Sequence, residues 1–256
     1  SDVATVAQAT IIQGASNSGT TTYSITDTAV AIAAASNAVL NGAQNIVTTD
    51  NPNIIQATTI EDASNQGSNT YNINDTAENI AGSSNAVLTL AQTVTANTNA
   101  TTAQATKISS FAKAVVYNIE GNASDIAGLG DQARNEAVNI IVSGNTNVAQ
   151  AKIITDATNS GTNTFNIFDT AANISAGITA DSTSLLEAGS RTVDGTANVA
   201  QAIILSGLSK RVIYNLSDNA TTIANASQAV RDEAVNISCS TSPTVHEAEI
   251  IDAARN

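Results

Sequence analysis

The chain has 256 residues, of which 12% are charged and 3% aromatic, and its 22 acidic and 9 basic residues give a net charge of -13. This acidic balance disfavours nucleic acid and anionic membrane surfaces as partners, because their phosphate groups would be repelled. The single cysteine and the single histidine exclude an internal disulfide framework, a multi-thiolate metal site and a pair of histidine ligands.

A tandem repeat runs through the whole chain. The heptapeptide Tyr23–Ala29 returns at spacings of 48, 46, 48 and 49 residues, beginning at Tyr71, Tyr117, Phe165 and Tyr214. A second motif of the type Val-Ala-Gln-Ala surrounds Gln8, Gln56, Gln104, Gln150 and Gln201, with a degenerate sixth copy at Val245–Ala248. We therefore expect one repeat domain over residues 1–256, with units at 1–48, 49–96, 97–142, 143–193 and 194–239 and a partial unit at 240–256.

Each unit splits into two halves, and each half predicts one short strand and one helix. In chain order, segments rich in Ile, Val, Thr and Tyr predict strands at 23–25, 45–47, 71–73, 93–95, 116–119, 139–142, 165–167, 192–193, 213–216 and 236–238. Between them, apolar residues at three- and four-residue steps predict helices such as 28–40, 76–90 and 148–159. The stretch 177–189 lengthens one half, and we expect it to form a surface loop.

The alternation of strands and helices predicts an α/β fold with parallel strands and right-handed crossovers. We expect a right-handed α/β solenoid with about ten short strands in one sheet and helices on one face only. The longest apolar run, Ala29–Ala35, is too short to cross a bilayer, so we expect no membrane insertion. The chain contains no methionine, so we expect that Ser1 is not a translation start and that the chain is processed, excised or a fragment.

Helix caps recur at fixed positions of the repeat. Carboxylates precede the second helix of four units, where we expect them to cap it, at Asp27, Asp75, Asp169 and Asp218. Gly121 takes this position in the third unit and predicts a weaker cap. We expect the first helix of each unit to be capped by Asn51, Asn99, Asn145, Thr196 and Ser242. The two prolines, Pro52 and Pro243, would then occupy the first helical position.

A polar row accompanies the strands. Asparagine precedes the strand isoleucine or its equivalent at Asn45, Asn72, Asn118, Asn139, Asn166, Asn215 and Asn236, and Ser24 and Thr93 take the same place in two other halves. On the sheet face opposite the aromatic residues, these amides would hydrogen-bond along the sheet axis. Alternatively, the row lies at a tight turn, and the pattern does not separate the two arrangements.

No constellation typical of catalysis or of cofactor binding occurs in the sequence. His246 and Cys239 each replace an ordinary repeat residue, and no third group is placed to orient them as a nucleophilic pair. The segment containing Asp50, Asn51 and Asn53 is a weak calcium candidate, but a turn before a capped helix explains it better. We expect no catalytic residue, no cofactor and no dedicated metal site.

The pattern Tyr-Asn-Ile-x-Asp-Thr-Ala-x-Asn-Ile, followed by the Val-Ala-Gln-Ala helix, resembles repeats of very large secreted or surface adhesin-like proteins of cyanobacteria and proteobacteria. The resemblance covers nearly the whole chain and implies an extracellular or cell-surface location. It also implies a scaffold, adhesive or layer-forming role.

The first functional hypothesis is a structural or adhesive repeat segment that stacks end to end into a filament or layer. Its partners would be copies of itself or flanking repeats of a longer parent chain. The alternative is a binding module whose exposed Asn/Thr sheet face recognises a protein or a glycan. An enzyme is the least supported class, because the repeat accounts for nearly every polar position.

Overall fold

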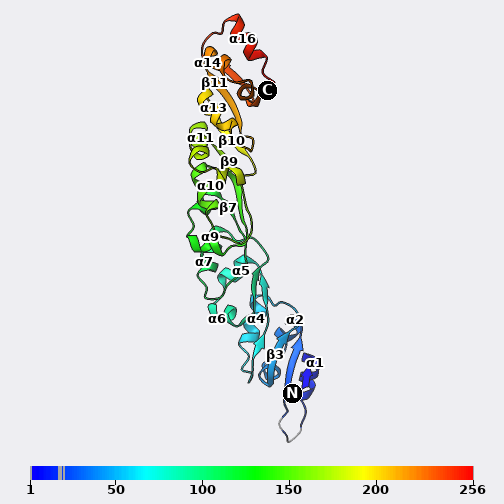
Figure 1. Cartoon of the computed structure of the whole chain (residues 1–256). Coiled ribbons are helices and arrows are strands. Elements are labelled where there is room, and N and C mark those ends of the chain that lie inside the picture. Colours follow the sequence, from blue (N-terminus) through cyan, green and yellow to red (C-terminus); the bar gives the residue numbers. More distant parts are fainter. Residues whose placement is uncertain (1, 17–18, 20, 256) are drawn as a thin grey trace. The chain divides into compact units, whose positions relative to one another are not determined.

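The computed structural model describes residues 2–16, 19 and 21–255, and the chain divides into two compact units (Figure 1). Unit 1 comprises residues 1–119 and 136–138, and unit 2 comprises residues 120–135 and 139–256. Both units consist of short parallel strands that alternate with short helices.

Unit 1 contains the first two repeats and about half of the third. Its strands are β1 (Asp2–Ala4), β2 (Tyr23–Asp27), β3 (Ala43–Thr48), β4 (Asn69–Thr70), β5 (Ile73–Asp75) and β6 (Val94–Ala96). Its helices are α1 (Val6–Gln13), α2 (Ala29–Ala33), α3 (Asn37–Asn41), α4 (Ile54–Glu61), α5 (Ala77–Gly82), α6 (Asn85–Leu90) and α7 (Thr102–Ser109).

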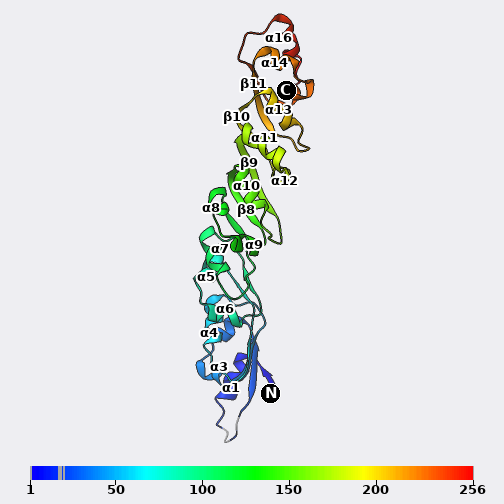
Figure 2. The ribbon, with the colours of Figure 1, turned by 60° about the vertical axis from the view of Figure 1, so that its left-hand side comes forward.

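Unit 2 continues the alternation. Its strands are β7 (Ile119–Asn122), β8 (Ile140–Thr146), β9 (Asn163–Thr170), β10 (Arg191–Ala197), β11 (Ile213–Asp218) and β12 (Ile237–Cys239). Its helices are α8 (Ala123–Ala127), α9 (Asp131–Glu136), α10 (Val148–Thr155), α11 (Ala171–Ala180), α12 (Thr183–Glu187), α13 (Val199–Ser206), α14 (Ala220–Asn225), α15 (Gln228–Glu233) and α16 (Val245–Asp252). In both views α10, α11 and α13 follow one another alongside β9 and β10 (Figures 1 and 2).

The α/β class is confirmed, but the expectation of one ten-stranded sheet is wrong. Unit 1 holds a four-stranded sheet, β1-β2-β3-β4, and a two-stranded sheet, β5-β6, whereas unit 2 holds a six-stranded sheet in the order β7 to β12. The pairs resolved in these sheets are parallel, as between β1 and β2 and between β11 and β12. The break in unit 1 lies at Tyr71 and Asn72, because β4 pairs with β3 whereas β5 pairs with β6.

The repeated aromatic and aliphatic residues form the core. The five residues at the first motif position are at most 2% exposed: Tyr23, Tyr71, Tyr117, Phe165 and Tyr214. In β9, Phe165 and Ile167 are buried while Thr164, Asn166 and Phe168 are exposed. Because strand residues alternate between faces, one face of β9 is buried and the other is open to solvent.

Two local expectations are corrected. The predicted helices 28–40 and 76–90 each divide into two short helices, because the chain is extended at Ser36 and Ser84, each of which begins a new helix. The insert at 177–189 is largely helical, since it contains the end of α11 and all of α12.

Two glycines hold a bend at the ends of β8 and β10. Gly144 and Gly195 have φ of 83° and 86°, the left-handed region that glycine adopts without a Cβ clash. The strand register shifts at both places, between Ile141 and Asn145 and between Thr192 and Thr196. They stand where the earlier repeats have Asp50 and Thr98, three residues before a helix cap.

Candidate functional site: the surfaces between half-repeats

The two kinds of half-repeat are named here by their motifs. A Gln half-repeat is a strand followed by a helix with the recurring Gln or, in α16, Glu, such as β3 with α4 or β12 with α16. A Tyr half-repeat is a strand with the Tyr or Phe followed by its helices, such as β5 with α5 and α6. The two kinds alternate along the chain.

The recurring glutamine is a capping residue. In α4, the Asn53 side chain accepts from the Gln56 N–H at 2.9 Å, and the Gln56 side chain accepts from the Asn53 N–H at 3.0 Å. This reciprocal capping box holds the first turn of the helix. The same arrangement starts α1, α7, α10, α13 and α16.

The predicted cap residues of these helices are wrong by two positions. The residues that cap them lie two positions later than expected, at Asn53, Thr101, Asn147, Asn198 and Thr244 in place of Asn51, Asn99, Asn145, Thr196 and Ser242. Pro52 and Pro243 therefore precede the cap and are not the first helical residues. The sequence signal for the true position was the Thr/Asn-x-x-Gln spacing of the capping box.

The motif aspartates join neighbouring half-repeats. Asp75 Oδ2 accepts from the Ile54 N–H at 2.8 Å, and Asp75 Oδ1 accepts from the Thr76 N–H at 2.7 Å. The equivalent bonds to the preceding Gln-half helix run from Val6 to Asp27 at 3.0 Å, from Val148 to Asp169 at 2.9 Å and from Val199 to Asp218 at 3.1 Å. Each aspartate thus places negative charge at the N-terminus of a helix some 20 residues earlier.

The predicted role of these aspartates as caps of the helix that follows them is corrected. That helix is capped by the next residue, as Thr76 caps α5 by accepting from the Asn79 N–H at 3.2 Å. The hydroxyl of Thr76 supplies the cap of α5, whereas the carboxylate of Asp75 joins the Thr76 N–H to the Ile54 N–H of the neighbouring half-repeat.

A second set of hydrogen bonds joins the helices of Tyr half-repeats to side chains of the Gln half-repeats that follow them. Ala29, the first residue of α2, donates its N–H to Asp50 Oδ1 at 2.6 Å. Ala77 and Ala220 donate in the same way to Thr98 Oγ1 and Thr241 Oγ1, both at 3.0 Å. Each kind of half-repeat therefore supplies a side chain that caps the helix before it.

The asparagine row lies along the sheet, as the first of the two alternatives predicts. Its amide oxygens bind the neighbouring strand, as when Asn72 Oδ1 accepts from the Thr93 hydroxyl at 2.8 Å and from its N–H at 3.1 Å. Similar contacts join Asn45 to Ser24 and Ser68, Asn139 to Thr162, Asn166 to Ser190, and Asn118 to Asn99. Asn236 donates directly to Asn215 Oδ1 at 2.9 Å.

The buried tyrosines tie the sheet to the helices. Tyr23, Tyr71 and Tyr214 donate their hydroxyls to the backbone oxygens of Val39, Val87 and Val230 at 2.8, 3.2 and 2.9 Å. Burial, with a smaller effect of Glu61, raises the pKa of Tyr71 to about 12. Burial, with a smaller effect of Glu233, likewise raises the pKa of Tyr214 to about 12. The pKa of Tyr117 is raised for the same main reason.

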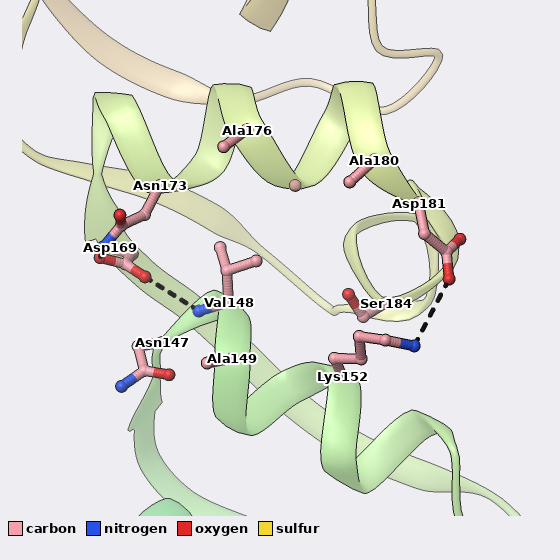
Figure 3. A pocket seen from close by; sticks show the side chains of 11 residues that line it. Asn147, Val148, Ala149, Lys152, Asp169, Asn173, Ala176, Ala180, Asp181 and Ser184 are labelled. Atoms are coloured by element: carbon pink, nitrogen blue, oxygen red, sulfur yellow. Dashed lines mark hydrogen bonds and ion pairs between the residues drawn. The ribbon is translucent and has the colours of Figure 1, made fainter.

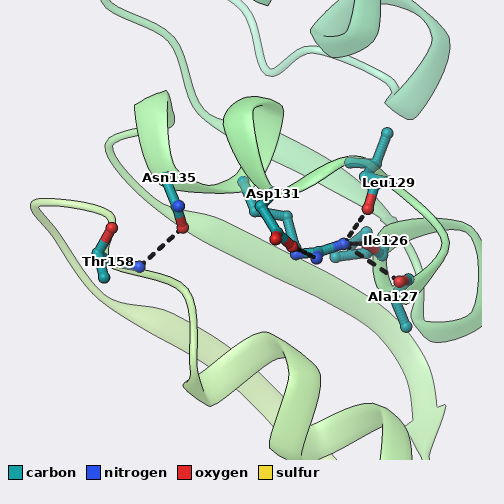
Figure 4. Close-up of polar contacts among 7 residues, drawn as sticks. Ile126, Ala127, Leu129, Asp131, Asn135 and Thr158 are labelled. Atoms are coloured by element: carbon teal, nitrogen blue, oxygen red, sulfur yellow. Dashed lines mark hydrogen bonds and ion pairs between the residues drawn. The ribbon is translucent and has the colours of Figure 1, made fainter.

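Three buried arginines were not found from the sequence. In unit 2, Arg134 donates to the backbone oxygens of Ile126, Ala127 and Leu129, which end α8, and pairs with Asp131 (Figure 4). Arg231 donates to Ile223, Ala224 and Ala226 at the end of α14. Arg191 donates to Leu185, Leu186 and Ala188 at the end of α12. A guanidinium at these carbonyls acts as a C-terminal cap.

A repeated sequence pattern could have identified two of these arginines. The pattern Arg-Asn/Asp-Glu-Ala-Val-Asn-Ile occurs at both 134–140 and 231–237. Arg134 and Arg231 stand where other repeats have a leucine that is at most 1% exposed, at Leu40, Leu88 and Leu185. Arg191 instead replaces the first strand isoleucine, and burial lowers its pKa.

A groove lies between α10 and α11 in unit 2 (Figure 3). It has a volume of about 570 Å³, and its walls include Val148, Ala176 and Ala180. At one end Lys152 Nζ lies 3.8 Å from Asp181 Oδ2 and 3.1 Å from Asp156 Oδ2. The Lys152 pKa is raised, chiefly by its hydrogen bond to Asp156. The groove thus has a salt bridge at one end, and small residues such as Ala176 and Ala180 line its walls.

The weak calcium candidates take part in the repeat bonds. Asp50 accepts from Ala29, and Asn53 caps α4, so these two oxygen-bearing side chains already hold backbone donors. Within the described residues, no group of three or more His, Cys, Asp and Glu side chains is placed to hold a metal ion. His246 lies 3.9 Å from Glu249 on exposed α16, and Cys239 is a half-buried free thiol in β12.

No helix in the described part of the chain is long and apolar enough to cross a bilayer. Comparison with known proteins gives no match among family models, curated proteins or solved structures.

Proposed function

We propose that the chain is a structural segment of a repeat array, folded as a right-handed α/β solenoid and working as a passive building element. The observation that carries this proposal is the exchange of caps between half-repeats. A Tyr half-repeat caps the helix of the Gln half-repeat before it through its aspartate, and a Gln half-repeat caps the preceding Tyr-half helix through Asp50, Thr98 or Thr241.

Such an exchange suits an array whose energy comes from nearest neighbours. A polar side chain from the next half-repeat accepts a hydrogen bond from a backbone N–H at the start of the preceding helix. Alanines at the centre of the contact let the helices approach closely. Ala57, Ala151 and Ala202 are all 0% exposed. Extending the array therefore needs no new surface, only a further copy of the same contact.

The location and biological role follow from the resemblance to bacterial surface repeats. We infer an extracellular or cell-surface protein with a scaffold or adhesive role, which contributes to a filament or layer and performs no catalysis. The high content of uncharged polar residues on the open sheet face is consistent with a surface that must remain hydrated while the core stacks.

A duplication experiment tests the array. Inserting a second copy of residues 151–201 directly after Gln201 preserves the Gln-Ala motif at both junctions. Two added strands at about 4.8 Å each should lengthen the sheet of unit 2 by about 10 Å, which small-angle scattering should detect as a larger radius of gyration. The variant should also unfold cooperatively, with no loss of stability.

An inserted copy that stays unprotected in hydrogen exchange, or that unfolds the rest of the chain, would contradict the array. A variant with the same 51 residues in scrambled order is the matched control, because it adds equal mass and charge without the caps.

A second candidate function is recognition of a protein or glycan by the open sheet face. One observation favours it: Phe168 and Ile213, 39% and 41% exposed, flank Thr192 in the paired strands β9, β10 and β11. Exposed apolar groups beside polar ones are typical of binding surfaces. Screening glycans and peptides against the wild type and the double variant Phe168→Ser/Ile213→Ser tests this function, and equal binding by both would exclude this face.

A further inference from the structure

The end of unit 2 presents an uncovered surface. β12 lies at the edge of the six-stranded sheet, where it pairs with β11. α16 packs against α14, but none of its residues is buried. Between β12 and α16 lies a cavity of about 700 Å³ whose walls include Ile237, Cys239, Ala248 and Ile251.

The residues of this surface are the ones that other Gln half-repeats bury. The motif alanine is 0% exposed in five helices, at Ala9, Ala57, Ala105, Ala151 and Ala202. Its counterpart in α16, Ala248, is exposed. Val245, which begins α16, is 78% exposed, whereas its counterpart Val199 is 6% exposed. The core side chains of the repeat are thus present here without the layer that covers them elsewhere.

The first backbone N–H of α16, that of Val245, also lies at this surface. The first N–H of four Gln-half helices is accepted by the aspartate of the following Tyr half-repeat, as from Val199 to Asp218. The N–H of Val245 is the equivalent donor, and within the described residues it has no acceptor. A carboxylate placed as Asp218 is placed would complete it.

We propose that the surface formed by β12 and α16 binds one further Tyr half-repeat. The occupant is a parallel strand of the pattern Tyr/Phe-Asn-Ile/Leu-x-Asp, followed by a Thr or Asn cap and a helix that begins with alanine. Its strand pairs with the free edge of β12, its helix covers Ala248 and Ile251, and its aspartate accepts from Val245. This inference rests on the proposed array and names the partner of its open end.

A second copy of the chain is opposed by charge, because each copy carries a net charge of -13.

The test supplies the missing half-repeat on the full chain. Fusing a copy of residues 211–227 directly after Asn256 places the copied Asp218 at the same separation from Val245 as the native Asp218 has from Val199. Cys239, the single cysteine, reports on the covered edge. Its reaction with a thiol reagent should slow by about tenfold or more, because a tethered segment acts at an effective concentration of about a millimolar. Hydrogen exchange at the Val245 amide should slow as well.

Variants of the copy separate specific docking from simple crowding. The change Asp218→Ala within the copy should restore most exchange at Val245, whereas Asn225→Ala, at an exposed helix position, should not. Equal Cys239 reactivity in the extended chain and in a chain extended by the scrambled segment would overturn the proposal.

Protection of Cys239 that grows with concentration in the unextended chain would also overturn it, since a second copy would then be the occupant. Neither result affects the outcome expected for the internal duplication of residues 151–201. A failure of this inference is therefore distinguishable from a failure of the array itself.

Discussion

Asp75 accepts a hydrogen bond from the backbone N–H of Ile54, 21 residues earlier in the chain, at 2.8 Å. The same carboxylate also holds the Thr76 N–H and the Asn79 side-chain amide, and Asp75 is only 7% exposed. One side chain therefore fixes the start of two helices that belong to neighbouring half-repeats.

Replacing this carboxylate should be costly. We expect Asp75→Ala to lower the free energy of unfolding by about 2–3 kcal/mol, since it removes a helix cap and leaves part-buried backbone donors without a charged acceptor. Urea unfolding measures the loss. Asp62→Ala removes the same charge from an exposed side chain without a hydrogen bond in the described structure, and should change stability by less than about 0.5 kcal/mol. Equal effects of the two variants would show that net charge, rather than the cap, is being measured.

Alkaline pH should unfold the protein through its buried tyrosines. Burial raises the pKa of Tyr71 and Tyr214 from 10.0 to about 12 in the folded chain. Because the folded pKa lies above the unfolded one, this stabilisation is fully present below about pH 10 and is lost as the pH rises towards 12. Absorbance of tyrosinate at alkaline pH should therefore rise together with the loss of helical circular dichroism. Ionisation near pH 10 with the fold intact would contradict the burial of these hydroxyls.

Tyr214→Phe gives the matching neutral-pH test. The hydroxyl donates to the Val230 carbonyl at 2.9 Å, and losing it should cost about 1–2 kcal/mol at pH 7. Above pH 11 the cost should shrink, because the wild type then also carries the penalty of a buried phenolate. Parallel urea titrations of the two proteins at both pH values measure the difference. A cost that does not depend on pH would mean that the hydroxyl is accessible to solvent.

The core was predictable from the sequence because the same core motif occurs five times. Tyr or Phe followed two residues later by Ile or Leu places both side chains on one strand face, and Phe165 and Ile167 are each 1% exposed. The cap assignments failed for a physical reason. A carboxylate just before a helix has a local interpretation, and only the fold brings Asp75 to Ile54, a partner half a repeat away. Similarly, the break of the sheet at Tyr71 depends on which strands pair, a long-range property that local β propensity does not specify.

The buried arginines illustrate a second limit. Charge alone places an arginine on the surface, and the acidic residues near these two in the sequence, such as Asp131 and Asp232, are consistent with exposed ion pairs rather than burial. Their partners are carbonyl groups at the ends of α8 and α14, which have no side-chain signature in the sequence. The substitution of Leu by Arg at one repeat position indicated a special role but did not show which atoms the guanidinium would bind.

Arg231 should tolerate leucine better than alanine. Arg231→Ala removes the donor to Ala224 and Ala226 and leaves a cavity at a buried position, for an expected loss of about 3 kcal/mol. Arg231→Leu restores the residue that other repeats carry at this position, so we expect it to recover the packing and lose only about 1–2 kcal/mol with the missing cap. Arg211→Ala, at an exposed position, is the charge-matched control. Thermal unfolding that ranks leucine below alanine would contradict this account of the position.

Two helical glycines should respond to alanine with opposite signs. A Cβ at Gly82, the last residue of α5, meets nothing within 4 Å, so Gly82→Ala should stabilise the chain by about 0.5–1 kcal/mol through helix propensity. A Cβ at Gly177, inside α11, would lie 2.8 Å from Val148 Cγ1 and 3.0 Å from Leu185 Cδ1. These neighbours belong to α10 and α12, and separating them should outweigh the propensity gain, for a net loss of about 1–2 kcal/mol. Denaturant midpoints of the two variants measure both effects. A stabilised Gly177→Ala would mean that α11 packs less closely on Val148 and Leu185 than these distances indicate.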